Sequence, residues 1–192
     1  TRVLKSMVIF QMFTIAIARL LNLIYGYEAI NLLLRITPSR LTVSILSHFG
    51  ATIGAGVRFQ SPFIIHNADQ VEPIYSNLIV GDNCYIGRDC IFDLMGKITI
   101  GNKVTISHRA VLNTHTHAGE SPLKNNQLKV SKGDIKISDG VYFGSNVTVL
   151  ECVTIGSNSI IGAFSLVNRD LPGNIVGFGI PCKVQKELNH GN

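Results

Sequence analysis

Two histidines, His115 and His117, open a polar segment that interrupts an otherwise regular apolar pattern. The segment begins Asn113-Thr114-His115-Thr116-His117 and continues to Asp134 through residues rich in glycine, lysine, asparagine and serine. Neutral histidine near pH 7 can remove a proton from a hydroxyl group, so either imidazole could be a general base. We therefore expect residues 113–134 to form a flexible loop that projects from a rigid scaffold and carries the chemistry.

The scaffold on both sides of this loop repeats with a period of six. In each repeat, an aliphatic or aromatic anchor is followed by glycine or another small residue, and the fifth position is small or β-branched. The anchors are Ile53, Val80, Ile86, Ile100, Ile106 and Leu112 before the loop, and Ile137, Phe143, Val149, Ile155, Ile161 and Val167 after it. This period fits a solenoid in which three short strands and three turns complete one triangular coil.

The anchor of each repeat is expected to point into the core. Turn residues such as Asn83 and Asn158 tolerate the left-handed backbone conformation that tight turns require. Cys84 and Cys90 fall on the small repeat position and are expected to be packing residues. None of the four cysteines forms a Cys-x-x-Cys pair, which favours free thiols in a reducing compartment.

Residues 1–46 predict an N-terminal segment of one or two helices, separated by Gly26 and ended by Pro38. Arg19 closes an apolar run that is too short to span a membrane, and no signal-peptide cleavage site follows it, so we expect an intracellular protein. The wide apolar face of these helices must be covered by protein or by a membrane interface. Packing within or between subunits is the simpler interpretation.

Composition and charge limit the possible partners. The chain has 192 residues, 46% of them hydrophobic, with 18 glycines and no tryptophan, which suits one domain made of many small turns. The net charge of +5 favours anionic partners. However, the basic residues are scattered and lack interleaved stacking aromatics, so nucleic-acid binding is not expected.

The segment from about Ile53 to Val184 resembles the hexapeptide-repeat acyltransferases, in the branch of galactoside and maltose O-acetyltransferases and their polysaccharide-modifying relatives. The resemblance rests on residues 155–167, on Asn168-Arg-Asp-Leu-Pro-Gly-Asn and on Gly177-Phe-Gly-Ile-Pro-Cys-Lys-Val184. It implies a mainly β fold, a left-handed parallel β-helix. An N-terminal helical segment (1–46) would precede the acyltransferase domain (47–184), which carries the loop 113–134, and a C-terminal tail (185–192) would follow. It also implies a homotrimer with active sites at subunit interfaces.

The activity that this resemblance implies is transfer of acetyl from acetyl-CoA to a hydroxyl of a sugar or glycan precursor, with no metal. Direct attack within one ternary complex would need no protein nucleophile. His117 falls on the position of the family's catalytic histidine, and His115 is the alternative base. Asp93 and Asn113 are the expected acceptor-binding residues, and Asp93 would either bond a sugar hydroxyl or orient the base.

The same resemblance implies a coenzyme A site along the groove between neighbouring coils. Its expected contacts are Gly144, Ser145, Ala163, Asn168, Arg169 and Lys183. Backbone at Gly144 and Ala163 would line the pantetheine arm, and Ser145 would stabilise the oxyanion. Arg169 and Lys183 would lie near the phosphates, whereas Asn168 stands where the galactoside enzymes carry threonine.

Other functions fit parts of the pattern. Serine O-acetyltransferases and sugar N-acyltransferases share the solenoid. A γ-class carbonic anhydrase would bind zinc through three histidines, and His66, His108, His115 and His117 are enough in number but not in the expected spacing. A non-catalytic scaffold is the remaining alternative. We expect a cytoplasmic protein, with the inner face of the membrane as a peripheral location.

Overall fold

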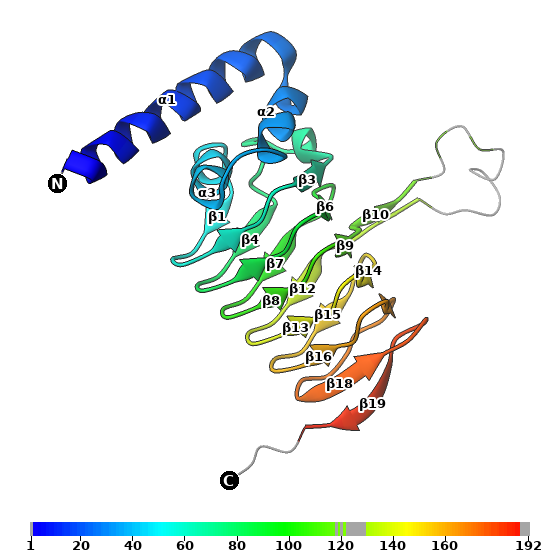
Figure 1. The fold of residues 1–192 in the computed structure, drawn as a ribbon. Helices are drawn as coiled ribbons and strands as arrows, with labels where there is room; N and C mark the ends of the chain where they lie inside the picture. The colour runs from blue at the N-terminus through cyan, green and yellow to red at the C-terminus, as the bar shows by residue number, and fades with distance from the viewer. Residues whose placement is uncertain (1, 118, 120, 122–129, 189–192) are drawn as a thin grey trace.

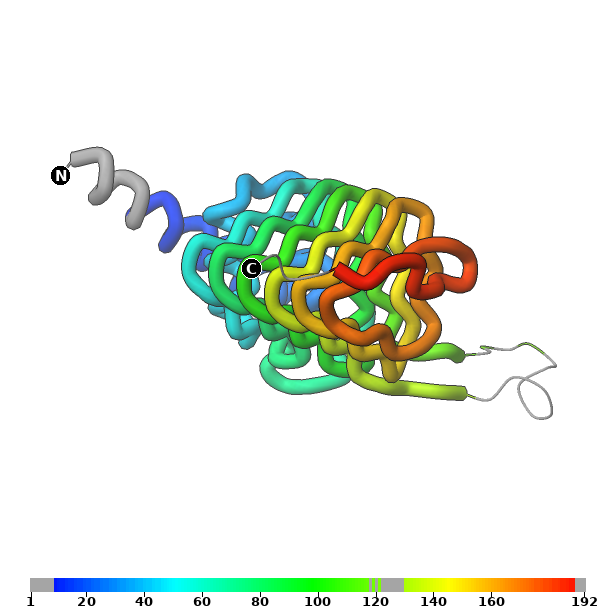
Figure 2. Tube along the Cα trace, turned by 90° about the horizontal axis from the view of Figure 1, so that it is seen from below, coloured from blue at the N-terminus to red at the C-terminus, as the bar shows by residue number. Residues whose placement is uncertain are grey.

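The computed structural model describes residues 2–117, 119, 121 and 130–188, and side chains from residue 9 onward. Three helices come first: α1 (Arg2–Tyr25), α2 (Tyr27–Leu34) and α3 (Ser39–His48). Short strands follow, and they wind into a stack of coils with three sheets as its faces (Figures 1 and 2). This architecture confirms the predicted left-handed parallel β-helix.

Each sheet takes one strand from successive coils, and all pairings within the stack are parallel until β19. The first sheet contains β1 (Thr52–Ile53), β4 (Leu78–Val80), β7 (Ile98–Ile100), β12 (Ile135–Ile137) and β15 (Thr154–Ile155). The second contains β2 (Arg58–Phe59), β5 (Tyr85–Ile86), β8 (Thr105–Ile106), β13 (Tyr142–Phe143), β16 (Ile160–Ile161), β18 (Ile175–Phe178) and β19 (Lys183–Glu187). The third contains β3 (Phe63–His66), β6 (Cys90–Asp93), β9 (Val111–Leu112), β14 (Thr148–Val149) and β17 (Leu166–Val167).

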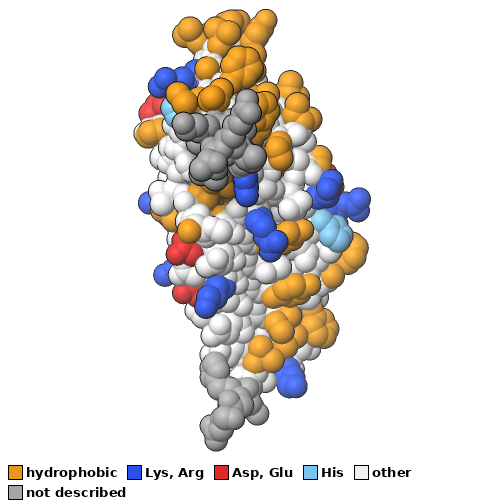
Figure 3. All heavy atoms as spheres, turned by 60° about the vertical axis from the view of Figure 1, so that its left-hand side comes forward, with side chains coloured by type: hydrophobic (Ala, Val, Ile, Leu, Met, Phe, Trp, Pro, Cys, Tyr) orange, Lys and Arg blue, Asp and Glu red, His pale blue; other side chains and the backbone are white. Residues whose placement is uncertain are grey.

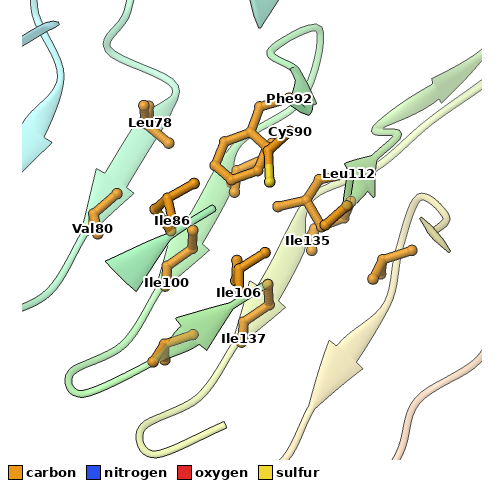
Figure 4. Close-up of a cluster of buried hydrophobic side chains, with 14 of the residues drawn as sticks. Leu78, Val80, Ile86, Cys90, Phe92, Ile100, Ile106, Leu112, Ile135 and Ile137 are labelled. Atoms are coloured by element: carbon orange, nitrogen blue, oxygen red, sulfur yellow. The ribbon is translucent and has the colours of Figure 1, made fainter. Parts of the chain in front are cut away.

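The anchors of the six-residue repeat form the core, as predicted. From Val80 onward every anchor is buried, and only Ile53, in the first coil, stays partly exposed. Ile86, Ile100, Ile106 and Ile137 stack across coils in Figure 4. Since the apolar area removed from water is the main favourable term in folding, this continuous column stabilises the whole stack.

Turns between strands follow the expected chemistry. Asn83 and Asn158 have φ of 57° and 58°, in the left-handed region predicted for them. Cys84 and Cys90 are buried at the small repeat position, while Cys152 is exposed. We call the turns from the second sheet to the third the second corner, and the segments from the third sheet back to the first the third corner.

One expectation about the N-terminal region is wrong. Pro38 does not end the helical region; it stands directly before α3, with φ of −67°. Proline is tolerated at the start of a helix because its φ already suits the first turn and no hydrogen bond needs its missing N–H. Gly26 does separate α1 from α2, as predicted.

Helices α2 and α3 close the N-terminal end of the solenoid. Their buried residues Ile30, Leu34, Ile45 and Leu46 belong to the same apolar core as the coils. A polar contact adds to this packing, because Asn31 Nδ2 donates to the carbonyl oxygen of Ile65, 3.1 Å away. No helix among the described residues combines the length and apolarity needed to cross a bilayer.

Candidate active site

The segment that interrupts the repeat leaves the solenoid at the third corner as a two-stranded stem. Strands β10 (His115–Thr116) and β11 (Ser131–Lys132) pair antiparallel, with His115 opposite Lys132. Figures 1 and 2 show this stem projecting sideways from the coils. Most of the segment beyond it, residues 118, 120 and 122–129, lies outside the described residues, as does the end of the predicted tail, 189–192.

Asp93 lies at the centre of a hydrogen-bond cluster beneath the stem. The residue is 4% exposed and ends β6, in the coil before the loop. Its Oδ2 accepts hydrogen bonds from the backbone N–H of Thr114, at 2.9 Å, and from the Thr114 hydroxyl, at 2.8 Å. The same oxygen lies 2.6 Å from Nδ1 of His115, and Oδ1 accepts from Asn67 Nδ2, also at 2.6 Å.

These contacts show what surrounds the Asp93 carboxylate. Both of its oxygens accept hydrogen bonds from protein groups, and the imidazole that it contacts is that of His115. Burial raises the pKa of Asp93, but hydrogen bonds from Asn67, His115 and Thr114 outweigh burial and hold this pKa below its ordinary value. An ionised Asp93 binds the tautomer of His115 that carries its proton on Nδ1, which leaves Nε2 as a proton acceptor.

His117 lies in a different environment at the outer end of the stem. Its side chain is exposed, and its Nδ1 accepts a hydrogen bond from the backbone N–H of Gly119 at 2.9 Å. A neutral ring that accepts this bond carries its proton on Nε2. In the free chain, therefore, His115 has an unoccupied proton acceptor at Nε2. His117 must first lose the hydrogen bond from Gly119 before its Nδ1 can accept a proton.

Two further side chains fix the stem. Asn113 Nδ2 donates to the carbonyl oxygen of His115 at 2.9 Å, so its amide supports the backbone beside the histidines. Glu151, one coil later, accepts from the hydroxyls of Thr116, at 3.1 Å, and Ser131. Burial raises the pKa of Glu151, but hydrogen bonds, chiefly from Ser131, bring it below its ordinary value.

Five of the six expected coenzyme A contacts divide between two corners. Gly144, Ser145 and Ala163 lie at the second corner, where a Cβ on Gly144 would come within 2.5 Å of the Ala163 backbone nitrogen. Only glycine therefore allows these two coils to stack so closely. Asn168 and Arg169 are exposed at the third corner.

Ser145 has a neighbour that its sequence context does not single out. Its Oγ lies 3.3 Å from Nδ1 of His108, one coil earlier. His108, Arg88 and Arg109 line a shallow pocket at the same corner. Lys183, the remaining expected contact, is exposed on β19 at the end of the second sheet.

The structure thus brings Asp93, Asn113 and His115 together at one corner, with His117 farther out on the same stem, and Gly144, Ser145 and Ala163 together at another corner. Sequence reasoning missed Asn67, Glu151 and His108. A signal existed for His108, because Arg88, His108, Ser145 and Ala163 all stand two residues after an anchor and must share a corner. No such register marks Asn67 or Glu151. Within the described part of the chain, no group of three histidine, cysteine or carboxylate side chains could hold a metal ion.

Comparison with known proteins gives a consistent set of relatives. A family model for the bacterial transferase hexapeptide (six repeats) matches residues 134–169. The galactoside O-acetyltransferase of Escherichia coli (strain K12) is 33% identical over 150 residues, which are 76% of this chain and 68% of that protein.

Two solved structures extend this result to the fold. A maltose O-acetyltransferase from Clostridium difficile 630 superposes with a TM-score of 0.69 at 29% identity, over 85% of this chain and 84% of that one. A galactoside acetyltransferase in complex with coenzyme A superposes with a TM-score of 0.64 at 27% identity, over 84% of this chain and 78% of that one. With its repeat, fold and histidine-bearing stem, the chain belongs to the hexapeptide-repeat acetyltransferases, in the branch of the galactoside and maltose O-acetyltransferases.

Proposed function

We propose that this protein transfers the acetyl group of acetyl-CoA to a hydroxyl of a sugar or glycan precursor. The observation that carries the proposal is the polar cluster of Asp93, Thr114 and His115 at the root of a stem that leaves the solenoid and bears the exposed His117 at its outer end. The relatives support the acceptor class, since they are named for galactosides and maltose.

In the proposed reaction, the acceptor hydroxyl oxygen attacks the thioester carbonyl carbon while an imidazole takes the hydroxyl proton. The tetrahedral intermediate then expels the coenzyme A thiolate, which takes that proton back from the imidazolium. We assign the base to His117, because it occupies the position of the family's catalytic histidine and is exposed to an incoming acceptor. His115 is the second candidate, because Asp93 already holds it in the tautomer of a base.

At the second corner, the backbone around Gly144 and Ala163 would line the pantetheine arm, and the Ser145 hydroxyl would donate to the oxyanion. The close stacking of Gly144 on Ala163 leaves backbone rather than side chain at this surface. Arg88, Arg109 and Lys183 are exposed cations on or near the second sheet and could neutralise the coenzyme A phosphates.

A homotrimer would account for the distance between the histidines of the stem and the proposed coenzyme A contacts. The histidines and the coenzyme A corner lie on opposite edges of the third sheet, so a neighbouring copy could supply one group to the other. An uncovered apolar stripe on the second sheet, Tyr142, Ile160 and Phe178, supports such an interface; these side chains are 45%, 38% and 48% exposed.

Replacing Tyr142 with lysine is expected to dissociate this assembly and remove activity with it, since three symmetry-related lysines would place unpaired charges in apolar contacts. Sedimentation equilibrium gives the mass, and acetyl transfer is measured on the same samples. The matched control, Ile36→Lys, changes an exposed apolar residue between α2 and α3, away from the second sheet, and should leave the mass unchanged. An active monomer would contradict the shared site.

The test of the proposed function is release of coenzyme A thiol from acetyl-CoA in the presence of simple sugars, nucleotide sugars, amino sugars and serine. Release with a hydroxyl sugar, together with an O-acetylated product by mass spectrometry, is expected. Transfer to an amino sugar nitrogen or to serine would instead assign one of the other acyltransferase classes. Failure of acetyl-CoA to bind at all would support a non-catalytic scaffold.

Glu151 is expected to act as a positioning residue. Removing its carboxylate in Glu151→Ala frees the hydroxyls of Thr116 and Ser131, loosens the stem and should lower kcat about tenfold through misplacement of the base. Glu151→Gln keeps an acceptor oxygen and should restore most of the activity. The exposed Glu187 provides the control, since Glu187→Ala should keep wild-type kcat. Equal losses of kcat in the Ala and Gln variants would show that the negative charge of Glu151 matters, and not its hydrogen bonds to the stem.

A further inference from the structure

The outward face of α1 is apolar over its whole described length. Large apolar side chains with exposed fractions from 38% to 83% lie along it: Ile9, Phe10, Met12, Phe13, Ile17, Leu20, Leu23 and Ile24. Ile9, Phe13, Leu20 and Ile24 recur at helical spacing and form the centre of one face. In Figure 3, hydrophobic side chains gather at this end of the molecule.

The orientation of α1 is fixed by its other face. Gln11 donates to the hydroxyl of Ser44 on α3, and Ala18 is fully buried. Asn22, which is half-buried, lies on that inner side as well. A surface helix of a globular protein normally turns its apolar face to the core, whereas α1 exposes its largest apolar side chains and has a mixed inner side, on which Ile15 is also half-buried. The described chain leaves the large apolar side chains of this face uncovered, whereas packing of the face between subunits stays a prediction.

The charge of the helical segment is the second observation about this region. Residues 1–46 contain five basic residues and one acidic residue, a net charge of +4, whereas residues 47–192 contain twelve basic and eleven acidic residues, a net charge of +1. Nearly all of the excess positive charge thus belongs to the helical segment. Arg19 is exposed beside the apolar face, and Arg35 is exposed directly after α2.

We propose that α1 lies flat in the interface of an anionic lipid bilayer, with its outward face in the acyl region and its basic residues against the headgroups. An apolar face with basic residues beside it is the pattern of helices that bind membrane surfaces. At 24 residues α1 is about 36 Å long, and no helix within the described part of the chain meets the length and apolarity needed to cross a bilayer. A second copy of this face would bring like charges together, whereas anionic lipid neutralises them.

The experiment is co-sedimentation of the whole chain with vesicles of phosphatidylcholine alone or of equal parts phosphatidylcholine and phosphatidylglycerol. Binding is expected to the anionic vesicles and to weaken with added salt. Phe13→Gln and Leu20→Gln should each lower the partition coefficient about tenfold, since each removes most of a buried apolar side chain. Arg19→Gln should lower it about fivefold, as one interfacial charge does.

Ile180→Gln is the matched control, because Ile180 is 75% exposed but lies at the opposite end of the solenoid. Its binding should equal that of the wild type. All four changed residues are exposed, so unchanged circular dichroism and thermal unfolding would show that folding is intact. Absence of vesicle binding, or equal loss in Ile180→Gln, would overturn the proposal. Self-association that Phe13→Gln abolishes, without vesicle binding, would assign the face to a second copy instead.

Discussion

Replacing His117 with alanine is expected to lower kcat for acetyl transfer about a hundredfold to ten-thousandfold, the usual range for loss of a general base. The acceptor hydroxyl would then have no group to take its proton as it attacks the thioester. Binding of acetyl-CoA should be unchanged, because the contacts proposed for the pantetheine arm, Gly144, Ser145 and Ala163, lie at another corner. Steady-state kinetics with the best acceptor and calorimetric titration with acetyl-CoA measure the two effects separately.

The matched variant is His115→Ala, two residues away on the same stem. Loss of His115 should reduce kcat less than loss of His117, since it removes the partner of Asp93 but not the proposed base. The opposite ranking would transfer the base to His115, whose Nδ1 contact with a carboxylate resembles the arrangement in histidine-dependent hydrolases. Similar modest effects in both variants would contradict a histidine base at this corner.

Replacing Asp93 with alanine is expected to lower the free energy of unfolding by about 3 kcal/mol near neutral pH. The substitution removes a buried carboxylate and leaves the donors of Asn67, Thr114 and His115 without their acceptor. Urea unfolding of the wild type and the variant measures the difference. Asp82→Ala is a suitable contrast, because that carboxylate is exposed and accepts one hydrogen bond from Ala55 among the described contacts. A loss in Asp82→Ala as large as that in Asp93→Ala would contradict the special role of the buried cluster.

The contribution of Asp93 to the free energy of unfolding should also depend on pH, and the pKa of Asp93 gives the direction. Because its pKa in the folded protein lies below the ordinary value of 3.8, folding favours the ionised form. The resulting stabilisation is complete above this ordinary value and is lost as the pH falls through the folded pKa. The difference in unfolding free energy between wild type and Asp93→Ala should therefore shrink in acid. A difference that grows in acid would contradict an ionised Asp93.

The sequence by itself determined the solenoid and its register. The anchors from Val80 to Val167 are buried where the six-residue period places them, because one triangular coil leaves no other way to bury them. The sequence also predicted the turns, since Asn83 and Asn158 adopt the expected left-handed backbone conformation. The sequence also located the polar segment with His115 and His117, because a break in a strict period is visible without any structure.

Only the tertiary structure decided which polar groups meet. Asp93 and His115 are 22 residues apart, and Glu151 reaches the stem from the next coil, so their contacts depend on how the insertions at the third corner are folded. The direction of the apolar face of α1 was likewise open, because helical periodicity shows that a helix has two faces but not which one meets the protein. Tertiary packing on α3 turned that face outward. Short-range sequence patterns thus determine the strands, turns and helices. Contacts between distant segments determine which polar groups meet at the stem and which face of α1 is exposed.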